Sequence, residues 1–160
     1  MTAPVLVLGL GNELFTDEGI GIEAARLIAG RDFDCVEVVD GGTLGLDLVP
    51  TLADRDHLLV LDAMVEDGSA PGDIVRLDDR AVRSARKLLM SAHQLGLSEA
   101  LAAADLWGRG PVDCAGVGMV PFDLGTGYGL SPAARSGLPA LVEEAAALLH
   151  SWGVKEAADA

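Results

Sequence analysis

Near the start of the chain, the six residues Val5–Leu10 contain only Val, Leu and Gly, and this run constrains the fold most strongly. An unbroken apolar run of this length suits a strand that is covered on both faces, as in a parallel sheet. Similar runs follow at residues 35–39 and 57–61, and a stretch with helical spacing separates the first run from the second. Strands that alternate with helices predict an α/β fold: a three-layer sandwich in which helices cover both faces of a mostly parallel, twisted sheet.

The same signals place the remaining elements. A helix should begin with Thr16 as its N-cap, ahead of two acidic residues, and end at Gly30. Further elements are expected as a short helix near 44–52, strands at 74–77 and 112–120, a helix at 95–106, and a last helix from Ser131 to Trp152. Residues 78–92 show no clear period, and the tail at 156–160 is expected to fray. A length of 160 residues fits one domain.

The charge balance limits the partners. Acidic residues outnumber basic ones by 25 to 11, which gives a formal charge of −14. This argues against nucleic acid and against an anionic membrane surface, because both are bound by clustered Lys and Arg. It permits a cation or a basic protein segment as partner, although a negative surface also simply keeps a protein soluble.

Other features point to the compartment. The first residues lack the basic region of a signal peptide, and no stretch approaches the ~18 apolar residues of a membrane span. Cys35 and Cys114 are far apart and neither belongs to a CxxC pair. A disulfide framework or a thiolate zinc site is therefore not expected, and a reducing, cytoplasmic environment is.

Acidic residues stand where the predicted strands end, at the edge where a parallel sheet carries its functional crevice. Asp17 and Glu18 come after the first strand, Asp40 after the second, and Asp62 ends the third. His93 directly precedes a predicted helix. Carboxylates and an imidazole together suit a divalent transition metal with open coordination positions. Neighbouring helical residues point about 100° apart, so the two acids after the first strand cannot both face one ion, and the spacing does not choose between them.

Each candidate also has a structural explanation. Asp17 and Glu18 could stabilise a helix N-terminus. Asp62 could cap a turn and Asp40 could form one before the glycine that follows it. His93 alone is weak evidence, because many histidines are simply hydrogen-bonded parts of the structure.

Three further features of the sequence do not indicate a functional site. His57 stands at the entry of its strand, which is the wrong end of the sheet, and His150 stands near the end of the last helix, where a cation is favoured. We interpret both as structural. Gly9 and Gly11 could suggest dinucleotide binding, but Leu14 occupies the position of the third glycine of that fingerprint.

The assembled residues resemble the hydrogenase maturation endopeptidases. Five motifs carry the resemblance in order, in the segments 9–21, 40–45, 61–63, 93–97 and 117–132. Together they span roughly residues 5–152, nearly the whole chain. Any one of them would be weak, but five in order at compatible spacing are specific.

The resemblance implies a five-stranded α/β sandwich that removes a C-terminal peptide from the large-subunit precursor of a nickel–iron hydrogenase after nickel insertion. It implies that the nickel belongs to the substrate and that the protease, expected to be a monomer, has no permanent cofactor. Carried over by position, the nickel ligands are Glu18, Asp62 and His93. Asp40 becomes a candidate for orienting water or peptide. Relatives often carry a Glu soon after the residue that corresponds to Pro121, and this chain does not.

Two other functions are compatible with part of this sequence. Peptidyl-tRNA hydrolases share the opening strand and the Gly-Leu-Gly-Asn motif, but they need a histidine soon afterwards and a basic surface. Here the first histidine is His57 and the charge is −14. A nickel-sensing scaffold that binds the precursor without cutting it would use the same ligands, so the sequence alone leaves that alternative open.

Overall fold

The computed structural model of the protein describes residues 2–42, 45–84 and 92–158, with the side chains of residues 92–95 outside the description. At its centre lies one sheet of five strands: β1 (Val5–Leu10), β2 (Val36–Gly42), β3 (His57–Ala63), β4 (Ile74–Leu77) and β5 (Asp113–Met119). The strand order is β2-β1-β3-β5-β4. All neighbours pair in parallel except β4, which runs antiparallel to β5 at one edge. The predicted five-stranded, mostly parallel sheet is confirmed.

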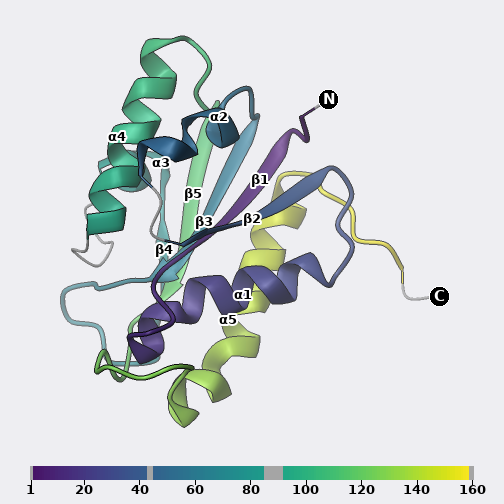
Figure 1. Ribbon diagram of the computed structural model, residues 1–160. Helices are drawn as coiled ribbons and strands as arrows, with labels where there is room; N and C mark the ends of the chain where they lie inside the picture. Colours follow the sequence, from purple (N-terminus) through teal and green to yellow (C-terminus); the bar gives the residue numbers. More distant parts are fainter. Residues whose placement is uncertain (1, 43–44, 85–91, 159–160) are drawn as a thin grey trace.

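Helices cover both faces of the sheet (Figure 1). One face carries α1 (Ile20–Ala29) and α5 (Pro132–Ser151), and the other carries α2 (Val49–Leu52), α3 (Asp79–Ser84) and α4 (Ala92–Leu106). Two short 3₁₀ helices, η1 (Thr16–Gly19) and η2 (Leu46–Leu48), lead into α1 and α2. Among the described residues, no helix combines the length and apolarity needed to cross a bilayer. The three predicted layers are therefore present.

The strands are apolar throughout because both of their faces are buried. In β3, Leu59 and Leu61 pack with α1 and α5, while Leu58 and Val60 pack with the helices of the opposite face. All four side chains are completely buried. Since successive residues of a strand point to opposite faces, an alternating apolar pattern would leave one of these layers without a core.

Several boundaries differ from those expected. β2 and β3 continue further than predicted, so Asp40 lies within its strand rather than after it, and Asp62 is followed by one more strand residue. α4 begins earlier, which places His93 in its first turn and not before it. Thr16 is not an N-cap: its φ is +52°, and its hydroxyl donates to the carbonyl of Gly125 at 2.7 Å.

The C-terminal tail is held in place over the residues that the structure describes. The amide of Asp34 donates to the carbonyl of Lys155 at 2.8 Å, and the amide of Ala157 donates to the carbonyl of Asp32 at 3.1 Å. Glu156 accepts two hydrogen bonds from the guanidinium group of Arg31. The expected fraying at 156–160 is therefore wrong for residues 156 and 157, because they pair with the segment that precedes β2. Residues 159–160 lie outside the described part.

Candidate active site

The carboxyl ends of β1 and β3 form the switch point of the sheet. From β1 the chain passes through α1 to β2 on one side, and it then returns through α2 to β3 on the other side. In open α/β sheets the functional crevice lies beyond the strand ends at such a point. We call the segments at the carboxyl ends of β1, β2, β3 and β5 the rim, namely residues 11–19, 40–42 with 45–48, 62–73 and 120–131.

Two glycines allow η1 and the start of α1 to lie directly on the strand ends. A Cβ on Gly21 would lie 2.1 Å from the carbonyl oxygen of Leu61. Gly11 has a φ of +136°, and a Cβ there would lie 2.0 Å from the carbonyl oxygen of Glu18. No larger residue fits at either position. The glycine motifs therefore serve close packing of backbone, and they bring the segment that carries Glu18 next to the end of the strand that carries Asp62.

Asp62 is completely buried at the end of β3. Its Oδ1 accepts the amide of Ala63 at 2.8 Å, and its register partner is Gly118 of β5. Leu61 and Ala63 pack with α1 and α5, so strand alternation directs the Asp62 side chain toward the face covered by α4. A buried carboxylate lowers stability unless it is hydrogen-bonded or bound to a cation. An Asp at this position therefore indicates a specific structural or functional role.

Asp17 is also completely buried, but its carboxylate is fully used inside the protein. Oδ2 accepts the amides of Phe122 at 3.0 Å and Asp123 at 2.9 Å and the hydroxyl of Ser131 at 2.9 Å, while Oδ1 accepts the amide of Ser131 at 2.7 Å. Four donors match the roughly four acceptor positions of a carboxylate. Asp17 therefore fastens the rim segment after β5 to η1 and is not placed to bind a metal.

Glu18 is the member of the acidic pair that remains a candidate. It is half-buried in η1, and η1 packs against β3. Its backbone amide is held by the carbonyl of Phe15 at 3.1 Å. The spacing left open whether Asp17 or Glu18 faces a metal ion. The hydrogen bonds of Asp17 favour Glu18, and no local sequence pattern predicts those bonds.

The N-terminal end of α4 lies at the same end of the sheet as the rim (Figure 1). A Cβ on Gly45 would lie 3.5 Å from the Cα of Gly96, so the rim segment after β2 contacts the beginning of this helix. The backbone of His93 is therefore near the rim, while its side chain lies outside the described part of the chain. Among the side chains that the structure does describe, no three His, Cys, Asp or Glu groups are arranged to hold a metal ion.

Comparison with known proteins now decides the family. The family model described as hydrogenase maturation protease matches residues 24–148. The hydrogenase 2 maturation protease of Escherichia coli K12 is 38% identical over 153 residues, covering 94% of this chain and 93% of that protein. The chain belongs to the hydrogenase maturation protease family. It is therefore a peptidase, as the five motifs predicted.

Further relatives agree with this assignment. The maturation protease is 41% identical over 155 residues to the hydrogenase expression/formation protein HupD of Bradyrhizobium diazoefficiens, covering 94% of this chain and 80% of that one. Its fold matches the hydrogenase maturating endopeptidase HybD of E. coli with a TM-score of 0.87, at 37% identity and 95% coverage of both chains.

In the maturation protease, Asp40 lies on the face of the sheet opposite to the one toward which Asp62 points. Its register with β1 places it on the side of α1, where the Nη2 of Arg26 is 3.7 Å from its Oδ2. Its Oδ1 accepts the amide of Gly42 at 2.9 Å, which is the turn-forming arrangement that the sequence allowed. A hydrogen bond to Glu13 raises the pKa of Arg26, so this cation persists beside Asp40. The structure does not bring Asp40 together with Asp62.

The two histidines that were interpreted as structural lie away from the rim of the protease. The ring of His57 stacks on Trp152 with centroids 4.4 Å apart, and its Nδ1 is 3.7 Å from a carboxylate oxygen of Asp113. His150, near the end of α5, has its Nε2 3.5 Å from a carboxylate oxygen of Glu156. Both rings are packed at the amino end of the sheet.

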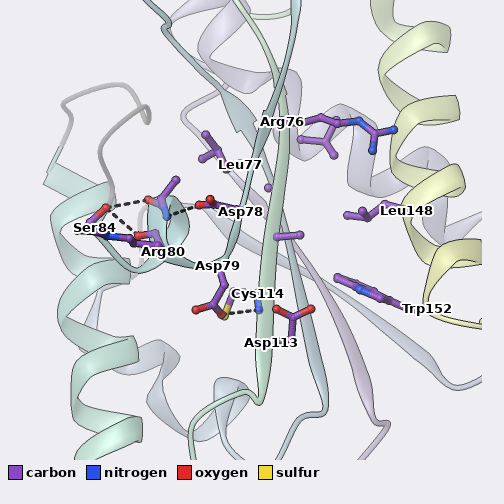
Figure 2. A pocket seen from close by; sticks show the side chains of 14 residues that line it. Arg76, Leu77, Asp78, Asp79, Arg80, Ser84, Asp113, Cys114, Leu148 and Trp152 are labelled. Atoms are coloured by element: carbon purple, nitrogen blue, oxygen red, sulfur yellow. Dashed lines mark hydrogen bonds between the residues drawn. The ribbon is translucent and has the colours of Figure 1, made fainter.

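A cavity of about 760 Å³ lies beside the first half of β5, between α3 and α5 (Figure 2). The cavity exists because β4 pairs only with residues 116–119 of β5, so the first residues of β5 have no neighbouring strand on that side. There the amide of Cys114 donates instead to Oδ1 of Asp79 in α3, at 2.8 Å. Burial raises the pKa of the Cys114 thiol to about 12, against the opposing charge of Arg83. The thiol stays protonated at neutral pH, so this cavity holds no cysteine nucleophile.

Sequence reasoning did not find that two rim segments of the protease are joined. The amide of Thr16 donates to the carbonyl of Gly127 at 2.9 Å, and the amide of Gly127 donates to the carbonyl of Leu14 at 2.9 Å. Phe15 and Gly127 form a parallel bridge. One signal was available, because Phe122, Leu124 and Tyr128 stand among glycines where a solvent-exposed loop is normally polar.

Proposed function

We propose that this protease removes the C-terminal peptide of a nickel–iron hydrogenase large-subunit precursor after nickel has been inserted, and that it uses the nickel of the substrate for recognition. Family membership supports the reaction class, and relatives such as the hydrogenase 2 maturation protease of E. coli carry hydrogenase maturation in their names. The metal is cargo of the precursor, and the protease needs no resident cofactor. We further propose that it acts as a monomer in the cytoplasm.

The proposed nickel contacts are Glu18, Asp62 and His93. The observation that carries this proposal is the packing of η1 and α1 on the ends of β1 and β3, which sets Glu18 beside the end of the strand that holds Asp62. Asp62 points toward the face covered by α4, and α4 carries His93 in its first turn. Two carboxylates and one imidazole would leave coordination positions open for ligands that the precursor itself supplies.

These residues would act mainly by positioning. Contact with the bound nickel would fix the scissile peptide bond against the rim, and positioning of this kind can lower a barrier by several kcal/mol. Water is the proposed nucleophile, and it adds to the scissile carbonyl carbon before the C–N bond breaks. The imidazole of His93 must be neutral to bind a metal, so recognition should weaken as the pH falls through the range in which histidine takes up a proton. The proposed role of Asp40 in orienting water has no supporting contact.

Cleavage of purified precursor, prepared with and without nickel, tests this function. We expect the nickel-loaded precursor to lose a C-terminal peptide, detected by mass spectrometry, and the nickel-free precursor to remain intact. Cleavage of both forms at equal rates would contradict recognition through nickel. Nickel-dependent binding without cleavage would favour the scaffold function instead.

A further inference from the structure

Five large apolar side chains are exposed on the two joined rim segments. They belong to the segments after β1 and after β5, and we call them the apolar platform: Leu14, Phe15, Phe122, Leu124 and Tyr128. Tyr128 is 77% exposed and Leu14 is 61% exposed. The backbone bonds between the two segments bring these side chains to one part of the surface, and large exposed apolar patches mark sites of interaction.

The platform is held in a fixed shape. Besides the bonds that Leu14 and Thr16 make with Gly127, the buried carboxylate of Asp17 accepts the amides of Phe122 and Asp123. The ring of Phe122 lies over Gly72, where a Cβ would be 2.6 Å from its Cζ, so the segment after β3 supports it. A surface that is already ordered loses little conformational entropy when a partner binds.

The rim segments around the platform hold more acidic than basic residues, although Arg135 follows the last of them, exposed in the first turn of α5. The four rim segments hold ten acidic residues and no Lys or Arg, and all eleven basic residues of the chain lie elsewhere in the sequence. Arg26 of α1 reaches toward the rim, where it is paired with Glu13 and Asp40. A partner with Lys or Arg set among apolar side chains would complement both properties of this surface.

We propose that the apolar platform is the docking site for a segment of the precursor near its scissile bond, and that this segment presents apolar side chains together with Lys or Arg. The proposal rests on the function proposed above, because it takes the precursor as the occupant. It adds a second contact, independent of nickel, which places the peptide chain beside Glu18 and Asp62. The platform adjoins these residues through η1, so one partner can reach both.

Paired substitutions test the docking site. Leu14→Ala combined with Tyr128→Ala should raise the KM for nickel-loaded precursor by about tenfold or more while kcat changes little, because contacts of this kind contribute to binding rather than to the chemical step. The matched control is Leu106→Ala combined with Val112→Ala. These residues are 84% and 78% exposed, and they lie at the opposite end of the sheet. Equal KM values for the platform variant and the wild type, or equal losses in both double variants, would overturn the proposal.

The sign of the partner's charge is tested at one position. Tyr128→Lys and Tyr128→Glu remove the same ring from an exposed site and differ only in the charge that they add. A basic partner should bind the Lys variant at least about threefold more weakly than the Glu variant at low salt, and the difference should shrink at high salt. If the Glu variant binds as weakly as the Lys variant or more weakly, the proposed basic segment is wrong.

Three outcomes separate this proposal from the proposed function. Binding of precursor that depends on the platform but leads to no cleavage would refute the function and leave the docking site standing. Cleavage of the precursor with the same KM in all variants would support the function and refute the docking site. Loss of self-association in the platform variant, measured by sedimentation and accompanied by unchanged precursor binding, would make a second copy of the chain the occupant and overturn the proposal. Thermal melting of each variant confirms that it is folded.

Discussion

The two ends of the sheet neutralise acidic residues in different ways. At the amino end, carboxylates pair with arginines: Glu37 with Arg55 at 2.7 Å, and Asp54 with Arg109. At the rim, the four segments supply no basic residue. Glu13 and Asp40 pair with Arg26 of α1, and the buried carboxylate of Asp17 is satisfied by backbone amides and one hydroxyl. Both ends therefore contain paired carboxylates, but the rim segments themselves supply acidic residues only, and a cation or a basic partner can complement that excess.

The largest expected effect is at the rim. Asp62→Asn keeps the size of the side chain but removes the charge, so it should lower the cleavage rate of nickel-loaded precursor by about a thousandfold or more. Asp113→Asn makes the same change in β5 at the amino end and should leave the rate nearly unchanged. Melting temperatures of both variants show whether the fold is kept. Normal cleavage by a folded Asp62→Asn protein would remove the functional distinction between the two ends.

The next effect concerns stability. Asp17→Ala leaves the partly buried amides of Phe122, Asp123 and Ser131 without their acceptor, so it should lower the free energy of unfolding by about 2–4 kcal/mol in urea titration. Asp54→Ala breaks an exposed ion pair with Arg109 at the amino end and should be indistinguishable from the wild type, because exposed pairs contribute little. A stable Asp17→Ala protein would mean that the rim segments are not joined through this carboxylate.

A smaller effect should reveal charge pairing beside β5. Burial alone would raise the pKa of Asp79, but hydrogen bonds from Arg83 and from the Cys114 amide hold it below its ordinary value. A carboxyl group whose pKa is lowered by folding stabilises the protein above its unfolded pKa of about 3.9, and this contribution is lost as the pH falls through the lower, folded value. The stability difference between wild type and Asp79→Asn, about 1 kcal/mol or less at pH 7 because the side chain is partly exposed, should therefore shrink below pH about 4. A constant difference between pH 7 and pH 3 would contradict this.

The smallest expected effect concerns the reactivity of the two cysteine thiols. Cys35 is exposed before β2, while Cys114 is buried beside Asp79 and the pKa of its thiol is raised to about 12. We expect a thiol reagent to modify Cys35 in the native protein at pH 8 and to reach Cys114 only after unfolding. Rapid labelling of Cys114 in a native Cys35→Ser protein would show that this part of the sheet opens easily.

Much of the fold follows from local sequence. β1 and β4 have the predicted bounds because their apolar runs are interrupted by glycine, proline or acidic residues. Ser131 caps α5 as expected, with its hydroxyl accepting the amide of Ala134 at 3.2 Å. The position of Glu18 and Asp62 at the carboxyl ends of the strands could be predicted, while their role in a site stays a prediction.

The remaining features depend on contacts between segments that are far apart in the chain. Thr16 does not cap a helix because Gly125, more than a hundred residues later, accepts its hydroxyl. Asp40 was grouped with Asp62, but strand register places the two on opposite faces of the sheet. The tail was expected to fray because the last residues of a domain are often poorly ordered, yet Lys155 and Ala157 pair with residues before β2. Local patterns contain none of this information.

Glu18, Asp62 and His93 are proposed to hold the nickel of the precursor together. The affinity of the protease for nickel-loaded and for nickel-free precursor, measured by titration calorimetry, tests it most directly. We expect the wild type to bind the nickel-loaded form about a hundredfold more tightly, and His93→Ala to bind both forms equally. A folded His93→Ala protein that keeps the full preference for nickel would contradict the account.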